Sequence, residues 1–315
     1  MVWDILMLIA GFVLLVKGAD FFVDGAASLA KRLGIPQLVI GLTIVAMGTS
    51  MPEAATSITA SLKDNVGITL GNVIGSNIFN VLVILGLTAL FTSVRMQKST
   101  LYYEIPFMLL ITGLTILFGW TDMRIVWWES LIFLALFAAY LGYMVYLTKK
   151  QPEQDNLEEN NIKEMAVWKS LLFVVGGAAG IVLGSTFVVD GATGIAKALS
   201  LSDKFIGLTI VAFGTSLPEL VTSVSAARKG NADIAIGNIV GSNIFNILFI
   251  LGIVGVINDI PFVTGGNTFA LDCVVAIVAG VLLWIGTVRK KQLRWPVGIA
   301  MLVGYAGYFV HLLLA

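Results

Sequence analysis

The chain has 315 residues, of which 58% are hydrophobic and only 12% are charged, and its mean hydropathy is +0.95. A soluble domain carries about a quarter charged residues, so this composition excludes a soluble globule, and the zero net charge argues against a nucleic-acid partner. The single cysteine excludes an internal disulfide, and the single histidine, His311, disfavours catalysis at a histidine-bound metal.

Ten apolar runs follow one another along the chain, and most approach or exceed the ~20 residues that cross a bilayer as a helix. The sequence therefore predicts an all-α, polytopic membrane protein with ten transmembrane helices, at about 5–30, 37–62, 66–91, 100–120, 126–148, 168–196, 204–228, 232–257, 267–288 and 296–314. The N-terminus lacks the basic residues of a signal peptide, so the first run is expected to be retained. The polar stretch 149–167 is interpreted as a solvated linker, with a weak calcium-collecting loop as the alternative.

Basic residues are distributed unevenly over the loops between these runs. Loops on the side of the two termini carry four lysines and arginines, whereas loops on the opposite side carry fourteen. Because the more basic side of a membrane protein faces the cytoplasm, we expect both termini outside and the linker 149–167 inside, in the plasma membrane.

The two halves of the chain repeat each other at an offset of 166 residues. Residues 41–86 and 207–252 are identical at 29 of 46 positions without a gap. Each half holds five predicted spans, and an odd number turns the second copy over in the membrane. We therefore expect two inverted five-helix repeats, 1–148 and 168–315. Such repeats are typical of secondary transporters, which bind substrate near the bilayer midplane where the repeats meet.

The segment GTSxPE places a carboxylate near the middle of an apolar span in each half. These carboxylates are Glu53 and Glu219, and an acid at that depth indicates a functional site. The proline before each glutamate frees the carbonyl four residues earlier, which becomes a candidate oxygen ligand. A simpler alternative is a capping box between Ser50 and Glu53 at a kinked helix.

The segment GNxxGSN adds amides and hydroxyls on one helix face, at a spacing of four residues. They are Asn72, Ser76 and Asn80 in the first half and Asn238, Ser242 and Asn246 in the second. Polar contacts that hold helices together are the alternative interpretation of any single member. Together with the glutamates they form an all-oxygen set, which suits hard cations such as calcium and sodium. Two carboxylates neutralise one Ca²⁺ or two Na⁺, so the two ions can compete for them.

These duplicated segments resemble the repeats of the sodium/calcium exchanger family, within the calcium/cation antiporters, over essentially the whole chain. The resemblance to prokaryotic members implies Na⁺/Ca²⁺ exchange by alternating access, in which the first and sixth spans slide as a unit. It implies that Glu53 and Glu219 are central calcium ligands shared with sodium, with Asn80 and Asn246 in the middle of the site. The remaining implied contacts are the carbonyls of Thr49 and Thr215, one sodium site at Ala46, Ser50 and Ser76, and its mate at Ala212, Ser216 and Ser242.

Asn246 departs from the potassium-dependent exchangers, which resemble this chain but have aspartate there. An amide adds no third negative charge, so we expect transport that is independent of potassium, and electrogenic if a further sodium binds. Na⁺ and Ca²⁺ are expected as substrates in a lipid bilayer, with no cofactor and no obligate protein partner. A Ca²⁺/H⁺ antiporter and a passive cation channel are the rivals, whereas no residue set suggests an enzyme. Lys17, Asp20 and Asp24 share a face of the first helix and are interpreted as a self-neutralised cluster, or as part of a gate.

Overall fold

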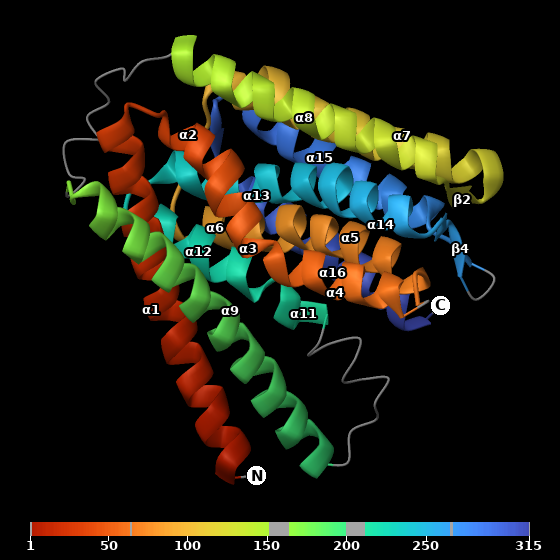
Figure 1. Ribbon diagram of the computed structural model, residues 1–315, viewed down its shortest axis with the longest axis horizontal. Coiled ribbons are helices and arrows are strands. Elements are labelled where there is room, and N and C mark those ends of the chain that lie inside the picture. Colours follow the sequence, from red (N-terminus) through yellow and green to blue (C-terminus); the bar gives the residue numbers. More distant parts are fainter. Residues whose placement is uncertain (1, 64, 151–163, 200–211, 265–266, 315) are drawn as a thin grey trace. The chain divides into compact units, whose positions relative to one another are not determined.

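A computed structural model describes residues 2–63, 65–150, 164–199, 212–264 and 267–314 (Figure 1). It divides into two compact units, of which one comprises residues 1–52 and 150–238 and the other comprises 53–149 and 239–315. Each unit combines chain from both halves of the sequence, so the units cut across the two predicted repeats. The π-helical turns are η1 (Gly41–Val45), η2 (Asn80–Leu85), η3 (Thr100–Glu104) and η6 (Asn246–Leu251). The α-helices are α1 (Val2–Leu33), α2 (Gln37–Ile40), α3 (Ala46–Thr49), α4 (Met51–Leu62), α5 (Gly67–Phe79), α6 (Gly86–Phe91), α7 (Ile105–Asp122), α8 (Trp127–Lys150), α9 (Val167–Ala198), α11 (Ala212–Thr215), α12 (Leu217–Arg228), α13 (Ala232–Phe245), α14 (Gly252–Ile257), α15 (Ala270–Val288) and α16 (Trp295–Leu314).

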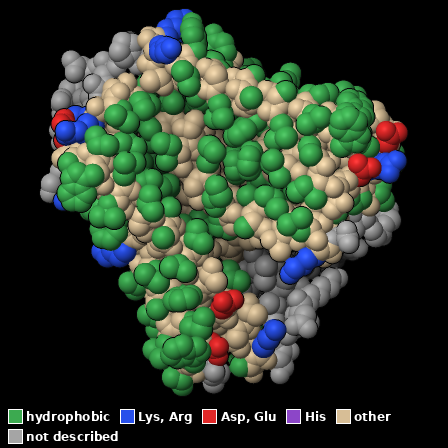
Figure 2. Space-filling model, in the orientation of Figure 1, with side chains coloured by type: hydrophobic (Ala, Val, Ile, Leu, Met, Phe, Trp, Pro, Cys, Tyr) green, Lys and Arg blue, Asp and Glu red, His purple; other side chains and the backbone are tan. Residues whose placement is uncertain are grey.

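The prediction of an all-helical membrane protein is confirmed. Within the described residues, eight helical segments are long and apolar enough to cross a bilayer, and a ninth span results if the interrupted pair Gln37–Thr49 and Met51–Leu62 is counted as one. Their bounds agree with the expected runs to within a few residues. The expected seventh span, 204–228, begins in residues 200–211, which lie outside the described part of the chain, and continues as α11 and α12. Figure 2 shows hydrophobic side chains spread over much of the face it draws, with charged side chains mostly toward its edges.

Helices α1 and α9 of the first unit run antiparallel and pack backbone against backbone (Figure 1). Three glycines spaced seven residues apart on each helix make this possible. A Cβ added to any of the six would lie between 2.5 and 2.8 Å from a backbone atom of the other helix. Because 32-residue helices exceed the hydrocarbon thickness, each must tilt or project from it. The six glycines are Gly11, Gly18, Gly25, Gly177, Gly184 and Gly191.

The first unit is completed by short helical pieces whose apolar side chains pack on this pair. Its core contains Phe22, Ile40, Val45 and Ile181, all at most 1% exposed. Gly41 and Gly237 allow η1 to approach α13 closely, because a Cβ at Gly237 would lie 2.8 Å from the backbone nitrogen of Leu42. The short segment that precedes Thr49 and Ser50 is thereby held against α13.

In its described residues, the second unit contains the remaining long helices and three two-residue antiparallel strand pairs. The pairs are β1 (Val94–Arg95) with β6 (Gln292–Leu293), β2 (Arg124–Ile125) with β3 (Ile260–Pro261), and β4 (Val263–Thr264) with β5 (Asn267–Thr268). These strands are a minor departure from the all-α prediction, and they tie the connections between helices together. Val94 and Ile260 are 166 residues apart, so the first two pairs follow the sequence repeat.

Candidate functional site

Each glutamate of the GTSxPE segments lies in the first turn of a helix that starts after a break. Ser50 and Ser216 form the breaks with nearly the same backbone angles, φ −84° and ψ 8° for Ser50 and φ −91° and ψ 3° for Ser216. Glu53 and Glu219 follow in the first turns of α4 and α12, and each is 1% exposed. A helix N-terminus carries partial positive charge, which favours a carboxylate there. Ser216 makes no side-chain cap hydrogen bond, which removes the capping-box explanation in the second half.

A cluster of buried polar side chains surrounds Glu219 in the first unit. Ser50 donates its hydroxyl to Glu219 Oε1 at 2.8 Å, and Thr49 donates to Asn238 Oδ1 at 2.9 Å. Asn238 in turn donates through Nδ2 to Ser223 Oγ at 2.9 Å and to the Glu219 carbonyl at 3.4 Å. These contacts fix the turn that carries the carboxylate and leave Glu219 Oε2 without a hydrogen-bond partner among the described residues.

The second unit repeats part of this cluster around Glu53. Asn72 donates through Nδ2 to Ser57 Oγ at 3.0 Å and to the Glu53 carbonyl at 3.3 Å. All three residues lie 166 positions before their counterparts in the first unit. An asparagine of the GNxxGSN segment therefore braces the helix turn that carries the acid in both halves.

Four asparagines of the second unit form a reciprocal network between the third and eighth spans. Asn77 donates to the carbonyl of Asn243 at 3.1 Å, and Asn243 donates to the carbonyl of Asn77 at 3.2 Å. Asn80 donates to Asn243 Oδ1 and Asn246 donates to Asn77 Oδ1, both at 3.0 Å. Replacing each residue by its equivalent 166 positions away turns each of these hydrogen bonds into another bond of the set. The network is therefore two-fold symmetric. A pseudo-two-fold relation between the repeats at this point is the simplest account of it.

The side-chain oxygens of Asn80 and Asn246 have no hydrogen-bond partner among the described residues, although both residues are at most 1% exposed. Their amide nitrogens are already engaged, which aims the carbonyl end of each amide away from those bonds. Buried polar atoms are normally satisfied, and an unpaired one needs a reason such as an unseen ion. Amide oxygens of this kind are hard donors, which calcium and sodium prefer.

The other expected ligands lie on the same short segments. Ser76 and Ser242 are buried one helical turn before Asn80 and Asn246. Ala46, Thr49 and Ser50 end the segment that precedes α4, and the Ala46 carbonyl accepts the Ser50 amide at 3.1 Å. In the second half, α11 spans Ala212 to Thr215, directly before Ser216. Among the described residues, no group of three or more His, Cys, Asp and Glu side chains is placed so that it could hold a metal ion.

Two features of these segments differ from the sequence-based expectation or were not foreseen. The carbonyl freed by Pro218, that of Gly214, accepts the hydroxyl of Ser185 at 2.8 Å, so a protein donor uses one of its lone pairs. π-Helical turns begin at Asn80 and at Asn246 in both halves, and such turns are frequent at functional sites. A π-helical turn cannot be predicted from local sequence, because its formation depends on how neighbouring helices pack.

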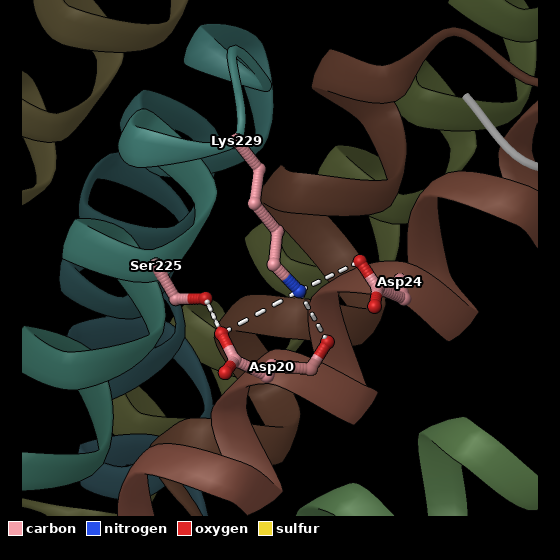
Figure 3. Close-up of polar contacts among 4 residues, drawn as sticks. All are labelled: Asp20, Asp24, Ser225 and Lys229. Carbon is pink, nitrogen blue, oxygen red and sulfur yellow. Dashed lines mark hydrogen bonds and ion pairs between the residues drawn. The ribbon is translucent and has the colours of Figure 1, made fainter. Parts of the chain in front are cut away.

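The acids Asp20 and Asp24 of α1 pair with Lys229, which directly follows α12 (Figure 3). Lys229 Nζ lies 2.7 Å from Asp24 Oδ1 and 3.5 Å from Asp20 Oδ1, and it donates to the Asp20 carbonyl at 2.8 Å. Ser225 donates to Asp20 Oδ1 at 2.7 Å. The interpretation of Lys17 as the neutralising partner was therefore incomplete, because Lys229, which is distant in the sequence, pairs with both acids.

Comparison with known proteins places this arrangement in a family. The family model described as "Sodium/calcium exchanger protein" matches residues 3–146 and 169–314. The protein CaxA of Alkalimonas amylolytica is 39% identical over 310 residues, which cover 96% of each chain. The sodium/calcium exchanger MaX1 of Methanosarcina acetivorans is 34% identical over 345 aligned positions, covering 98% of each chain. A structure of the sodium-calcium exchanger NCX_Mj, soaked without Na⁺ and Ca²⁺, is similar with a TM-score of 0.85 and 32% identity, covering 99% of each chain.

Proposed function

The chain belongs to the sodium/calcium exchanger family, and on that premise we propose that it exchanges Na⁺ for Ca²⁺ across the membrane by alternating access at a shared, all-oxygen site. The proposal is carried by buried side-chain oxygens that have no hydrogen-bond partner among the described residues, on Glu219 in the first unit and on Asn80 and Asn246 in the second. Each occurs on a segment that the sequence duplicates. Each is of the ligand type that fits these ions and disfavours zinc or copper.

We assign the central calcium-binding role to the carboxylates of Glu53 and Glu219. Their helix turns are braced alike, by Asn72 in one half and by Asn238 in the other. The amide oxygens of Asn80 and Asn246 complete the middle of the site. Burial makes both charges costly when no cation is present, because an ionised carboxylate loses its hydration there. That cost opposes movement of an empty site and so couples the outward passage of one ion to the inward passage of the other.

We assign the sodium contacts to the residues that flank these acids. One set is Ala46, Ser50 and Ser76, and its mate is Ala212, Ser216 and Ser242, with carbonyls of Thr49 and Thr215 shared between calcium and sodium. The hydrogen bond from Ser50 to Glu219 supports this grouping, since it links a residue of the first set to a central acid. A third sodium beyond the two that balance the carboxylates would make the exchange electrogenic.

The proposed orientation follows the distribution of basic residues. Both termini lie outside, the repeats are 1–148 and 168–315, and the linker 149–167 is cytoplasmic, with the chain in the plasma membrane. Of this linker, residues 151–163 lie outside the described part of the chain. Cysteines placed in the linker and near the termini test this orientation. In intact cells, a membrane-impermeant reagent should label those near the termini, and only a membrane-permeant reagent should label those in the linker.

Calcium uptake into sodium-loaded proteoliposomes is the experiment that tests the exchange. Uptake should require the outward sodium gradient and should be accelerated by an inside-positive voltage, because a net positive charge leaves with each cycle. A pH gradient should not replace the sodium gradient, as it would for a Ca²⁺/H⁺ antiporter. Calcium flux that persists without any counter-ion would instead identify a channel. Replacing potassium by choline should leave the rate unchanged, since Asn246 carries no charge.

The same assay tests the two acids with substitutions that preserve their size. Glu53→Gln and Glu219→Gln should each lower uptake by about 100-fold or more, because calcium affinity depends strongly on ligand charge. Glu129→Gln is the matched control, since Glu129 is a buried glutamate of α8 that binds the Val126 backbone. It should retain exchange within about threefold. Full activity in both site variants would remove the assignment.

A further inference from the structure

A cavity of about 350 Å³ lies in the second unit between the start of the fourth span and the end of the fifth. Its walls are mainly aromatic, formed by four tyrosines and a phenylalanine together with a leucine and an alanine, and it contains one acid, Glu104. The lining residues are Tyr102, Tyr103, Glu104, Phe107, Leu136, Ala139, Tyr140 and Tyr143. None of them belongs to the exchange site described above.

Glu104 is held in one orientation and keeps one oxygen unused. Tyr143 donates its hydroxyl to Glu104 Oε1 at 2.8 Å. Glu104 is 1% exposed, and its Oε2 has no hydrogen-bond partner within the described residues. Nor does Glu104 join any of the ion pairs found in that part of the chain. A buried carboxylate with no cation beside it and with one oxygen lacking a donor is costly, so the cavity favours a ligand that supplies both a positive charge and a hydrogen-bond donor.

The aromatic walls narrow the chemistry of that ligand. Phe107 stacks on Tyr140 with ring centroids 6.0 Å apart, and the rings of Tyr103 and Tyr143 lie 6.4 Å apart. Aromatic faces attract organic cations, and a carboxylate among them adds a charge-assisted hydrogen-bond acceptor. A primary ammonium satisfies both groups, because it carries positive charge and three N–H donors. A quaternary ammonium would satisfy the aromatic faces but leave Glu104 Oε2 without a donor.

The position of the cavity indicates where the ligand comes from. Tyr102 and Tyr103 at its rim are 52% and 63% exposed, and Leu110 and Leu117 continue the Tyr103 stripe along the outer face of α7. Tyrosine near a span end marks the headgroup level of a bilayer. Lys98 before the fourth span and Lys149 and Lys150 at the end of α8 lie beyond it at the same end, where they can bind phosphate. These features suit a lipid headgroup better than a solute in water.

We propose that this cavity binds the headgroup of a phospholipid with a primary ammonium, which donates a hydrogen bond to Glu104 Oε2 between the tyrosine rings. The phosphate then lies toward the basic residues at the span ends, and the acyl chains follow the apolar outer face of α7. Such a lipid would hold the start of the fourth span against the fifth without touching the transported ions.

Native mass spectrometry of the full-length, detergent-purified protein tests the assignment without any variant. With equal amounts of phosphatidylethanolamine, phosphatidylcholine and phosphatidylglycerol, we expect phosphatidylethanolamine to be retained at least about fivefold more than either competitor, as one additional charge-assisted hydrogen bond allows. Equal retention of the choline lipid would overturn the primary-ammonium assignment. If millimolar ethylammonium protected the protein against unfolding as strongly as the lipid does, the cavity would be a site for a soluble amine. That result would overturn the lipid assignment.

Variants then locate the lipid. Glu104→Gln should abolish the preference for phosphatidylethanolamine, and Tyr143→Phe, which removes the hydrogen bond to Oε1, should weaken it. Tyr146→Phe is the matched control, since Tyr146 lies on the same helix but outside the cavity lining. If Glu104→Gln does not fold, Tyr143→Phe and the lipid competition on the unmodified chain still decide the question. An unchanged preference in Tyr143→Phe and Glu104→Gln would place the lipid elsewhere.

Discussion

Two helix interfaces of this protein reach tight packing by opposite means. In the first unit, α1 and α9 meet through six glycines, and their contact is one of backbone against backbone. In the second unit, α5 and α13 meet through Asn77 and Asn243, which exchange hydrogen bonds with each other's carbonyls. Glycine packing excludes side chains but has no direction along the helix axis, whereas paired amides bond in a single register.

The difference fits what each pair would have to do under the proposed exchange by alternating access. Asparagines that position ion ligands must hold one geometry, and directional bonds achieve that. Helices that move as a body need to remain attached to one another, and close van der Waals contact in the membrane achieves that. Both interfaces repeat at 166 residues. Each half therefore contributes equivalent residues to both interfaces.

Breaking the glycine interface should have the largest effect. In Gly184→Ala the new Cβ would lie 2.5 Å from the Leu15 nitrogen and 2.8 Å from the Gly11 carbonyl oxygen, and backbone atoms cannot move aside as a side chain can. We expect a loss of about 3 kcal/mol in stability, at the upper end of overpacking effects. Gly176→Ala on the same helix is the control, because its Cβ would meet nothing within 4 Å. Thermal unfolding in detergent compares them, and equal melting temperatures would refute the close contact.

Breaking the asparagine interface should lower the stability somewhat less, and by the same amount whether the asparagine of α5 or that of α13 is replaced. Asn77→Ala and Asn243→Ala each remove one donor to a buried carbonyl and leave another asparagine nitrogen unpaired. We expect each to lower stability by about 2 kcal/mol, as for other buried unsatisfied groups. Because the two environments are related by the repeat, the losses should match within about 0.5 kcal/mol. Clearly different stability losses in the two variants would show that the symmetric hydrogen bonds do not contribute equally to stability.

The amide oxygens beside that interface sharpen the comparison, since they should affect ion binding more than stability. Asn80→Ala and Asn246→Ala each delete an unpaired oxygen. We expect the apparent calcium affinity in the proteoliposome assay to fall by about tenfold in each, which corresponds to 1.4 kcal/mol. Asn231→Ala is the control, because it removes another buried asparagine, directly before α13. Unchanged affinity in both site variants would exclude these oxygens as ligands.

The smallest effect is expected where the symmetry fails. Lys229 pairs with Asp20 and Asp24, yet the residue 166 positions after Asp20 is Thr186, which bonds within its own helix. Because exposed ion pairs contribute about 0.2–1 kcal/mol, Lys229→Met should change the turnover rate by no more than about fivefold. Calcium affinity should stay unchanged, and Lys229→Arg should behave as the unmodified chain. A loss as large as that of Glu219→Gln would place Lys229 in the ion path.

Sequence alone was sufficient for the membrane class, the repeat, and the identity of the acids and amides in it. A run of apolar residues, a fixed offset and a charged residue inside a span are properties of the chain itself. Tertiary structure was needed for the partners. Lys229 meets Asp20 and Asp24, and Ser185 donates to the carbonyl of Gly214. Among the described residues, the amide oxygens of Asn80 and Asn246 have no hydrogen-bond partner. Hydrogen bonds and ion pairs between distant segments depend on which helices pack together, and that is decided by the whole fold rather than by local sequence.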